Sequence, residues 1–121
     1  MTTTTVVDEL LATRLGSGSV EVYATPAMVA LMEEAAVAAI ARFLPEGQSS
    51  VGIALDVKHL AATPLGEKVR ARAEVIAVEG RKVTFQVQAW DDHELIGEGH
   101  HTRFVIDAAR FLKRVQSKAQ D

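Results

Sequence analysis

Residues 25–44, TPAMVALMEEAAVAAIARFL, form the longest apolar stretch of the chain and decide its fold. Thr25 and Pro26 are typical of a helix start, because a threonine hydroxyl caps free backbone N–H groups and proline fits the first helical position. We expect the helix to run to about Phe43 and to end before the proline and glycine of residues 45–47. Its first half leaves no polar stripe, which is typical of a helix enclosed by other elements.

Three side chains with useful chemistry are attached to this helix and to the segment after it. Thr25 stands at the helix start, Glu33 lies within the helix, and His59 ends the segment SVGIALDVKH, residues 50–59. Burying a carboxylate costs free energy unless it is paired or hydrogen-bonded. The cost of placing Glu33 in this helix therefore favours a structural or chemical role, and we take the three residues as candidate catalytic residues.

The segments after the helix alternate apolar and polar residues, which predicts β-strands. The expected strands cover residues 51–57, 68–78, 83–90 and 95–106, and turn residues separate them at 63–66, 79–82 and 91–94. A short strand is also expected at residues 20–23, and a short helix at residues 107–115. This order predicts an α+β domain in which an antiparallel sheet wraps one long central helix.

The 121 residues fit one domain, residues 1–121, with a weakly specified N-terminal segment (1–18) and a C-terminal extension (107–121). Sixteen acidic against 13 basic side chains give a net charge of −3, so no nucleic-acid partner is expected. No apolar run reaches the roughly 18 to 20 residues of a membrane span, so no membrane partner is expected. The N-terminus lacks signal-peptide features, so we expect a cytoplasmic location.

The chain contains no cysteine, which excludes disulfide, thiolate and iron–sulfur chemistry. His100 and His101, with His93 nearby, invite a metal-site hypothesis. Neighbouring residues on a strand point to opposite faces, so His100 and His101 are poorly placed to bind one ion. We therefore expect no metal site.

The element order and the candidate residues together resemble the hot-dog fold, and more narrowly its fluoroacetyl-CoA thioesterase-like branch. The match covers about residues 15–110 and keeps the family's spacing of eight residues from Thr25 to Glu33 and twenty-six from Glu33 to His59. The stretches that carry it are the ATP helix start with Thr25, Glu33, VGIALDVKHLAATPLG (51–66) with Gly52 and His59, and GEGHHTRFVI (97–106) with Arg103.

This resemblance implies an acyl-CoA thioesterase that releases a free acid and coenzyme A, with no cofactor apart from the coenzyme A of the substrate. Glu33 would act either as a nucleophile that forms a mixed anhydride or as a general base that activates water. His59 would relay the proton or orient the water, and Thr25 would hydrogen-bond Glu33 or the substrate. The resemblance also places Gly52 beside the backbone donors for the substrate carbonyl, and Arg103 in the substrate site.

Two further expectations come from the same resemblance. Hot-dog sites usually form between two subunits, which implies a homodimer or a higher homo-oligomer whose site residues come from both chains. The fluoroacetyl-specific members carry a gating phenylalanine before the first strand, whereas residues 16–20 of this chain, GSGSV, contain no aromatic residue. The sequence therefore favours a broader or different short-chain acyl-CoA as the substrate.

Other interpretations stay open at this point. A non-catalytic acyl-CoA-binding or assembly module would keep the pocket and make no use of Glu33. An enoyl-CoA hydratase uses the same fold, although Asp56 and His59 lie three residues apart and do not match the spacing expected of that group. Each candidate residue also has a purely structural interpretation. Thr25 would be a helix cap, Glu33 a residue of an exposed helix edge, and His59 a surface or hydrogen-bonded histidine. Gly52 would mark a bulge or close packing, and Arg103 would be an ion-pair partner on a strand.

Overall fold

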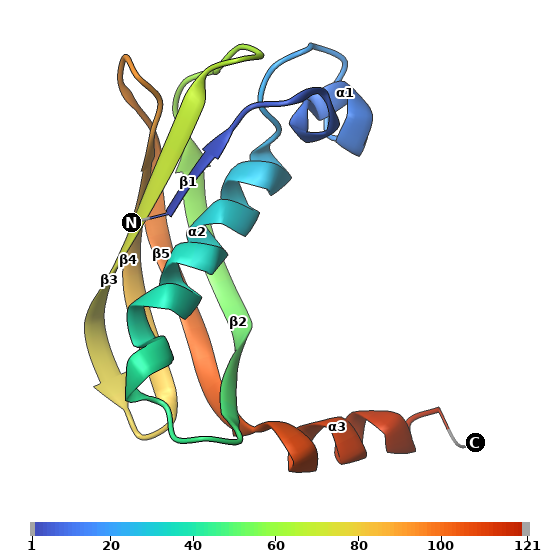
Figure 1. The fold of residues 1–121 in the computed structure, drawn as a ribbon, viewed down its shortest axis with the longest axis vertical. Coiled ribbons are helices and arrows are strands. Elements are labelled where there is room, and N and C mark those ends of the chain that lie inside the picture. The colour runs from blue at the N-terminus through green and yellow to red at the C-terminus, as the bar shows by residue number, and fades with distance from the viewer. Residues whose placement is uncertain (1, 120–121) are drawn as a thin grey trace.

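The computed structural model describes residues 2–119, which form a five-stranded antiparallel sheet that curls around a central helix (Figure 1). The strands lie side by side in the order β1-β3-β4-β5-β2. In chain order they are β1 (Thr2–Thr5), β2 (Gln48–His59), β3 (Lys68–Glu79), β4 (Lys82–Trp90) and β5 (Leu95–Asp107). The expected α+β hot-dog arrangement is confirmed.

The helical elements are the central helix, two short pieces before it, one turn after it and a C-terminal helix. They are η1 (Asp8–Leu10), α1 (Ala12–Leu15), α2 (Thr25–Ile40), η2 (Ala41–Phe43) and α3 (Ala108–Ser117), where η marks a 3₁₀ turn. Together α2 and η2 end at Phe43, as predicted. Helix α3 begins where the Asp107 carboxylate accepts the backbone N–H of Arg110 at 3.1 Å, which is an N-cap. No helix within residues 2–119 is long and apolar enough to cross a membrane.

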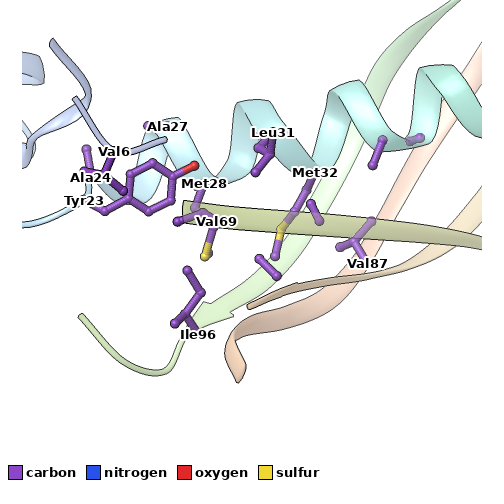
Figure 2. Packing of buried hydrophobic residues seen from close by; sticks show 14 of the residues in the cluster. Val6, Tyr23, Ala24, Ala27, Met28, Leu31, Met32, Val69, Val87 and Ile96 are labelled. Carbon is purple, nitrogen blue, oxygen red and sulfur yellow. The ribbon is translucent and has the colours of Figure 1, made fainter. Parts of the chain in front are cut away.

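The core lies between one face of α2 and the concave face of the sheet. Figure 2 shows Met28 and Met32 of α2 pointing at the sheet, near Val69 of β3, Val87 of β4 and Ile96 of β5, and all five side chains are fully buried. Burial of a large apolar side chain contributes about 1.5–3 kcal/mol each, so this layer is the main source of stability. It also fixes which face of α2 is left for the site.

The opposite face of α2 is uncovered in the single chain. Ala30, Glu34, Val37 and Ala38 are exposed along it. The expectation that the helix is enclosed on all sides is therefore wrong for one chain, because a single sheet covers only one face of the helix.

Strand β2 is an edge strand that pairs only with β5 in the described residues. Gly52 pairs with Arg103 and His59 pairs with Gly97, and the register shifts between Gly52 and Ala54. The shift is a β-bulge, which agrees with the structural interpretation of Gly52. Its effect is to set residues 48–52 and 54–59 in separate registers along β5.

The N-terminal segment departs from the expectation. Thr2–Thr5 is a strand that pairs with β3 rather than a weakly specified lead-in. Residues 20–23 are not a strand. Tyr23 makes an isolated bridge to Leu11, and its N–H donates to the Thr63 carbonyl at 2.8 Å. This segment therefore pairs with other loops, because its backbone groups find partners there and not on a neighbouring strand. Met1 and the last two residues of the predicted C-terminal extension lie outside the described residues.

A buried carboxylate anchors the loop that follows His59. Thr63 donates its hydroxyl to Asp91 at 2.9 Å, and the other Asp91 oxygen accepts the N–H groups of His93 and Glu94 at 2.8 and 2.9 Å. Burial opposes ionisation of Asp91, but the hydrogen bonds from His93, Thr63 and Glu94 outweigh it, so the pKa of this carboxyl lies below its usual value. The loop is thus tied to the β4–β5 turn.

The close approach of β2 and β5 gives a stability prediction. A Cβ on Gly99 would overlap the backbone oxygen of Asp56 and the Cα of Val57. We expect Gly99→Ala to lower the free energy of unfolding by about 2–3 kcal/mol in urea denaturation, because backbone must move to make room. The control is Gly18→Ala, whose Cβ would meet its nearest atom at 3.5 Å. A Gly99→Ala protein as stable as this control would contradict the packing described.

Candidate active site

The first cluster of candidate residues joins the start of α2 to the end of β2. The Thr25 hydroxyl lies 2.8 Å from Nδ1 of His59, so the two side chains are hydrogen-bonded. The N-cap of α2 is Ala24, and Thr25 is the first residue of the helix without a capping bond from its side chain. The expectation that Thr25 caps the helix is therefore wrong, because its hydroxyl is used by the imidazole instead.

Burial controls the charge state of His59. Desolvation lowers the pKa of its imidazole from the usual value, and a weaker interaction with the Ala61 backbone acts in the opposite direction. Nε2 is buried and has no hydrogen-bond partner of good geometry in the described part of the chain. The result is a neutral imidazole at pH 7 that is held directly against a hydroxyl group. This arrangement suits a general base.

The Thr25–His59 pair opens on a cavity of about 390 Å³. Its walls come from the glycine- and serine-rich loop of residues 17–20 and from residues 59–62, and Val22 and Tyr23 also line it. The loop of residues 17–20 contributes no aromatic side chain, whereas Tyr23 and His59 do. Apart from these two rings, a small group bound there would contact small and aliphatic side chains.

The second cluster surrounds Glu33 in the middle of α2. One Glu33 oxygen lies 3.4 Å from Nη1 of Arg103 on β5, and the Glu33 side chain remains 42% exposed while the Arg103 side chain is 8% exposed. A Cβ on Gly52 would lie 3.0 Å from the same Glu33 oxygen. The missing side chain of Gly52 therefore leaves room beside the carboxylate, at a cavity of about 260 Å³.

Two residues that we did not predict from sequence hold Arg103 in place. Ser50 accepts Nε–H through its hydroxyl at 2.8 Å and an Nη2 hydrogen through its carbonyl at 2.9 Å. His101 Nδ1 lies 2.9 Å from the Ala54 carbonyl, so Nδ1 carries the hydrogen and Nε2 accepts from Arg103 at 3.2 Å. The available signal was the spacing of His101 and Arg103, which places both on one face of a strand.

The two clusters do not meet within one chain. Glu33 makes no hydrogen bond to Thr25 or His59 in residues 2–119, and it follows Thr25 by eight helical residues, about 12 Å along the axis. The structure thus brings together Thr25 with His59, and Glu33 with Gly52 and Arg103. The five candidate residues do not form a single constellation in one subunit.

The same geometry bears on the other sequence hypotheses. His101 is buried and His100 is exposed, as expected for neighbours on a strand. Among the described side chains, no three His, Asp or Glu residues gather where they would hold a metal ion. The side chains that gather in the two clusters are a hydroxyl with an imidazole, and a carboxylate with a guanidinium.

The environment of His59 gives a prediction about pH. We expect its imidazole to titrate with a midpoint below the usual value of about 6.5, because burial penalises the charged form. The folded pKa is lower than the unfolded one, so the associated stability is present above the unfolded pKa and is lost as the pH falls through the folded pKa. The measurement is ¹⁵N NMR titration of the histidine side chains, with His59→Gln to assign the signal. A midpoint at or above 6.5 would contradict the prediction.

Comparison with known proteins places the chain in a family. The model of the FlK family, the fluoroacetyl-CoA-specific thioesterases, matches residues 6–109. The fluoroacetyl-CoA thioesterase of Streptantibioticus cattleyicolor is 46% identical over 98 residues, which cover 81% of this chain and 70% of that protein. The family match spans both clusters of candidate residues.

Solved structures agree with the sequence match. The structure of the fluoroacetyl-CoA thioesterase FlK superposes with a TM-score of 0.92 at 38% identity, covering 97% of this chain and 91% of FlK. A thioesterase superfamily member from Thermus thermophilus superposes with a TM-score of 0.88 at 31% identity, covering 98% and 90%.

Ligands are present in two FlK variants that are each 38% identical to this chain. One is in complex with fluoroacetate and CoA, and the other is in complex with acetyl-CoA.

The extent of the sequence and structural matches leads to one conclusion. This chain belongs to the fluoroacetyl-CoA thioesterase family of the hot-dog thioesterase superfamily.

Proposed function

We propose that this protein hydrolyses the thioester of a short-chain acyl-CoA to the free acid and coenzyme A. The observation that carries the proposal is the pairing of the neutral His59 imidazole with the Thr25 hydroxyl on a small cavity, at the family's spacing from Glu33. Membership of a thioester hydrolase family supports the same reaction.

Glu33 starts the reaction in one of two ways. Its carboxylate attacks the thioester carbonyl and forms a mixed anhydride, which water then cleaves, or it removes a proton from the water that attacks. In both routes the C–S bond breaks and the thiolate of coenzyme A takes up a proton. His59 activates water or passes the proton, because its neutral imidazole is a base of suitable strength.

Arg103 acts as a positioning residue in this scheme. Four of its N–H groups are occupied by Ser50, Glu33 and His101, which leaves little capacity to bind substrate directly. The contact with Arg103 aims the Glu33 carboxylate at the space beside Gly52, where the absent side chain admits the thioester carbonyl. This role replaces the direct substrate contact that the resemblance implied for Arg103.

The substrate class follows from the walls of the His59 cavity. Residues 17–20 contribute glycine, serine and valine where the fluoroacetyl-specific members place an aromatic gate, and Ala61 and Ala62 add small side chains. A wall of this kind discriminates weakly among small acyl groups, because one methylene in a hydrophobic pocket changes binding by only about 1–3 kcal/mol. We therefore propose broader short-chain acyl specificity.

We further propose that the working protein is a homodimer joined along β2. The free edge of β2 is twelve residues long, and Ile53 and Leu55 are 53% and 41% exposed on it. Natural proteins cover long apolar edges of this kind. The exposed face of α2, with Ala30 and Val37, is a second uncovered surface with apolar side chains, and we propose that a second copy covers both surfaces.

The dimer also accounts for the division of the site. Within one chain, Glu33 is separated from the Thr25–His59 pair by about 12 Å of helix. A second copy across β2 brings its own α2 beside the first, and a complete site would then draw residues from both chains. This supports the dimer as the catalytic unit.

The catalytic role of Glu33 is tested with an exposed glutamate outside the proposed interface as the control. We expect Glu33→Gln to lower kcat at least about 100-fold on the best substrate, because it removes the carboxylate that attacks or activates water. Glu74→Gln removes a carboxylate from an exposed position on β3, away from the β2 edge, and should keep kcat within about twofold. The measurement is thiol release from acyl-CoAs from acetyl to long-chain and aryl.

Several outcomes would contradict the assignment. Equal turnover by Glu33→Gln and wild type would remove Glu33 from the reaction. Binding of acyl-CoA without thiol release by wild type would favour a non-catalytic binding module. Hydration of an enoyl-CoA without thiol release would favour the hydratase.

The dimer is tested by a charge placed on β2, at the proposed interface between the two copies. We expect wild type to sediment as a dimer and Ile53→Lys to sediment as a monomer with little activity, because a lysine would be buried against the second copy. Ile76→Lys, at a residue that is 49% exposed on β3, is the matched control and should remain an active dimer. A monomeric wild type in sedimentation velocity, or a dimeric Ile53→Lys, would contradict the proposal.

A further inference from the structure

Positive charge gathers at the end of the molecule where β5 runs into α3. Six of the 13 lysine and arginine residues lie in residues 81–82 and 110–118, although the whole chain carries a net charge of −3. Helix α3 extends away from the sheet at this end, beside the start of β2 (Figure 1). No acidic residue occurs from Ala108 to Lys118. The site described above uses none of these cations.

Three of the cations surround a cavity of about 430 Å³ in the angle between α3 and the sheet. Arg81 at the β3–β4 turn and Arg110 and Arg114 on α3 line it. Within residues 2–119, none of the three guanidinium groups makes an ion pair or a side-chain hydrogen bond. The nearby Asp107 carboxylate is engaged with the backbone of Arg110. Unpaired guanidinium groups in a shared cavity favour phosphate, which they bind through two parallel hydrogen bonds.

The same cavity has an aromatic wall. Phe104 of β5 and Phe111 of α3 both line it, and Phe104 is 39% exposed. Exposed aromatic faces stack on planar bases, and arginine adds a cation–π contribution. A ligand that combines phosphate groups with a planar base fits this lining better than a simple anion does.

We propose that this cavity, which we name the arginine cavity (Arg81, Phe104, Arg110, Phe111 and Arg114), binds the 3′-phosphorylated ADP end of coenzyme A. The inference rests on the proposed function and names the part of the substrate that all acyl-CoAs share. Recognition of this invariant end leaves the acyl cavity free to accept different groups.

The position of the arginine cavity is compatible with this role. Arg103 precedes Asp107 by four strand residues, about 13 Å. Phe104 lies on the opposite face of β5 from Arg103, because neighbouring strand residues alternate. The substrate therefore passes round the end of the sheet where Gln48 pairs with Asp107, and the long flexible pantetheine arm spans this path.

The test compares substrates with and without the nucleotide. We expect Arg110→Ala/Arg114→Ala to raise KM for acyl-CoA about tenfold or more, because charge-assisted hydrogen bonds to phosphate are lost, while kcat is unchanged. KM for the same acyl group on pantetheine should not change, and 3′-dephospho-CoA should give an intermediate effect. The control Lys113→Ala/Lys118→Ala removes the same charge from α3 outside the cavity and should leave KM within about twofold.

Three kinetic results would overturn the proposal: an unchanged KM for acyl-CoA, an equal rise for the pantetheine substrate, or an equal rise in the lysine control. The same kinetic comparison is also made with thioesters of acyl carrier protein as substrates. Loss of activity on these alone would make α3 a surface for an acidic protein and not a nucleotide site.

A binding measurement separates this inference from the proposed function. Calorimetry with adenosine 3′,5′-bisphosphate needs no turnover, and we expect binding to wild type that weakens about tenfold or more in the arginine variant but not in the lysine control. Binding without hydrolysis would leave the arginine cavity intact and remove the thioesterase proposal. Equal affinity in all three proteins, or no binding to wild type, would overturn the arginine cavity alone.

Discussion

The packing of one apolar face of α2 against the concave face of the sheet is the interaction on which the rest of the structure depends. Met28 and Met32 enter the sheet from α2 and are fully buried among residues of β3, β4 and β5. In proteins most of the stability of a helix comes from tertiary packing, so the 16-residue helix α2 depends on this contact. Because the contact fixes the rotation of the helix, it also fixes where Thr25 and Glu33 emerge.

The electrostatic arrangement follows from that rotation. Glu33 emerges at the border of the packed face, where it meets the buried Arg103, and a buried guanidinium is stable only when its charge is paired and its N–H groups are satisfied. Ser50 and His101 complete those bonds from β2 and β5. The same network therefore serves stability and orients the carboxylate.

The sequence predicted the elements well where local patterns are strong. The apolar stretch at residues 25–44, the alternation in the later strands and the turns between them correspond to α2, η2 and β2 to β5. The predictions for residues 2–5 and 20–23 were wrong, because these short polar or mixed segments take their structure from partners far away in the sequence. Thr2–Thr5 becomes a strand only because β3 offers an edge, and Tyr23 bonds to Thr63 forty residues away.

For the candidate site, too, some features could be predicted from the sequence and others could not. By itself, the sequence determined the fold class, because the class depends on periodicity along the chain. The spacing of Thr25, Glu33 and His59 was also fixed by the sequence, and its resemblance to the family's pattern made these residues candidates. Only the tertiary structure decided that Thr25 bonds His59 and does not cap its helix, that Ser50 and His101 hold Arg103, and that Glu33 lies in a separate cluster. These facts depend on the register of β2 against β5 and on the rotation of α2, which are set by packing between residues far apart in the sequence.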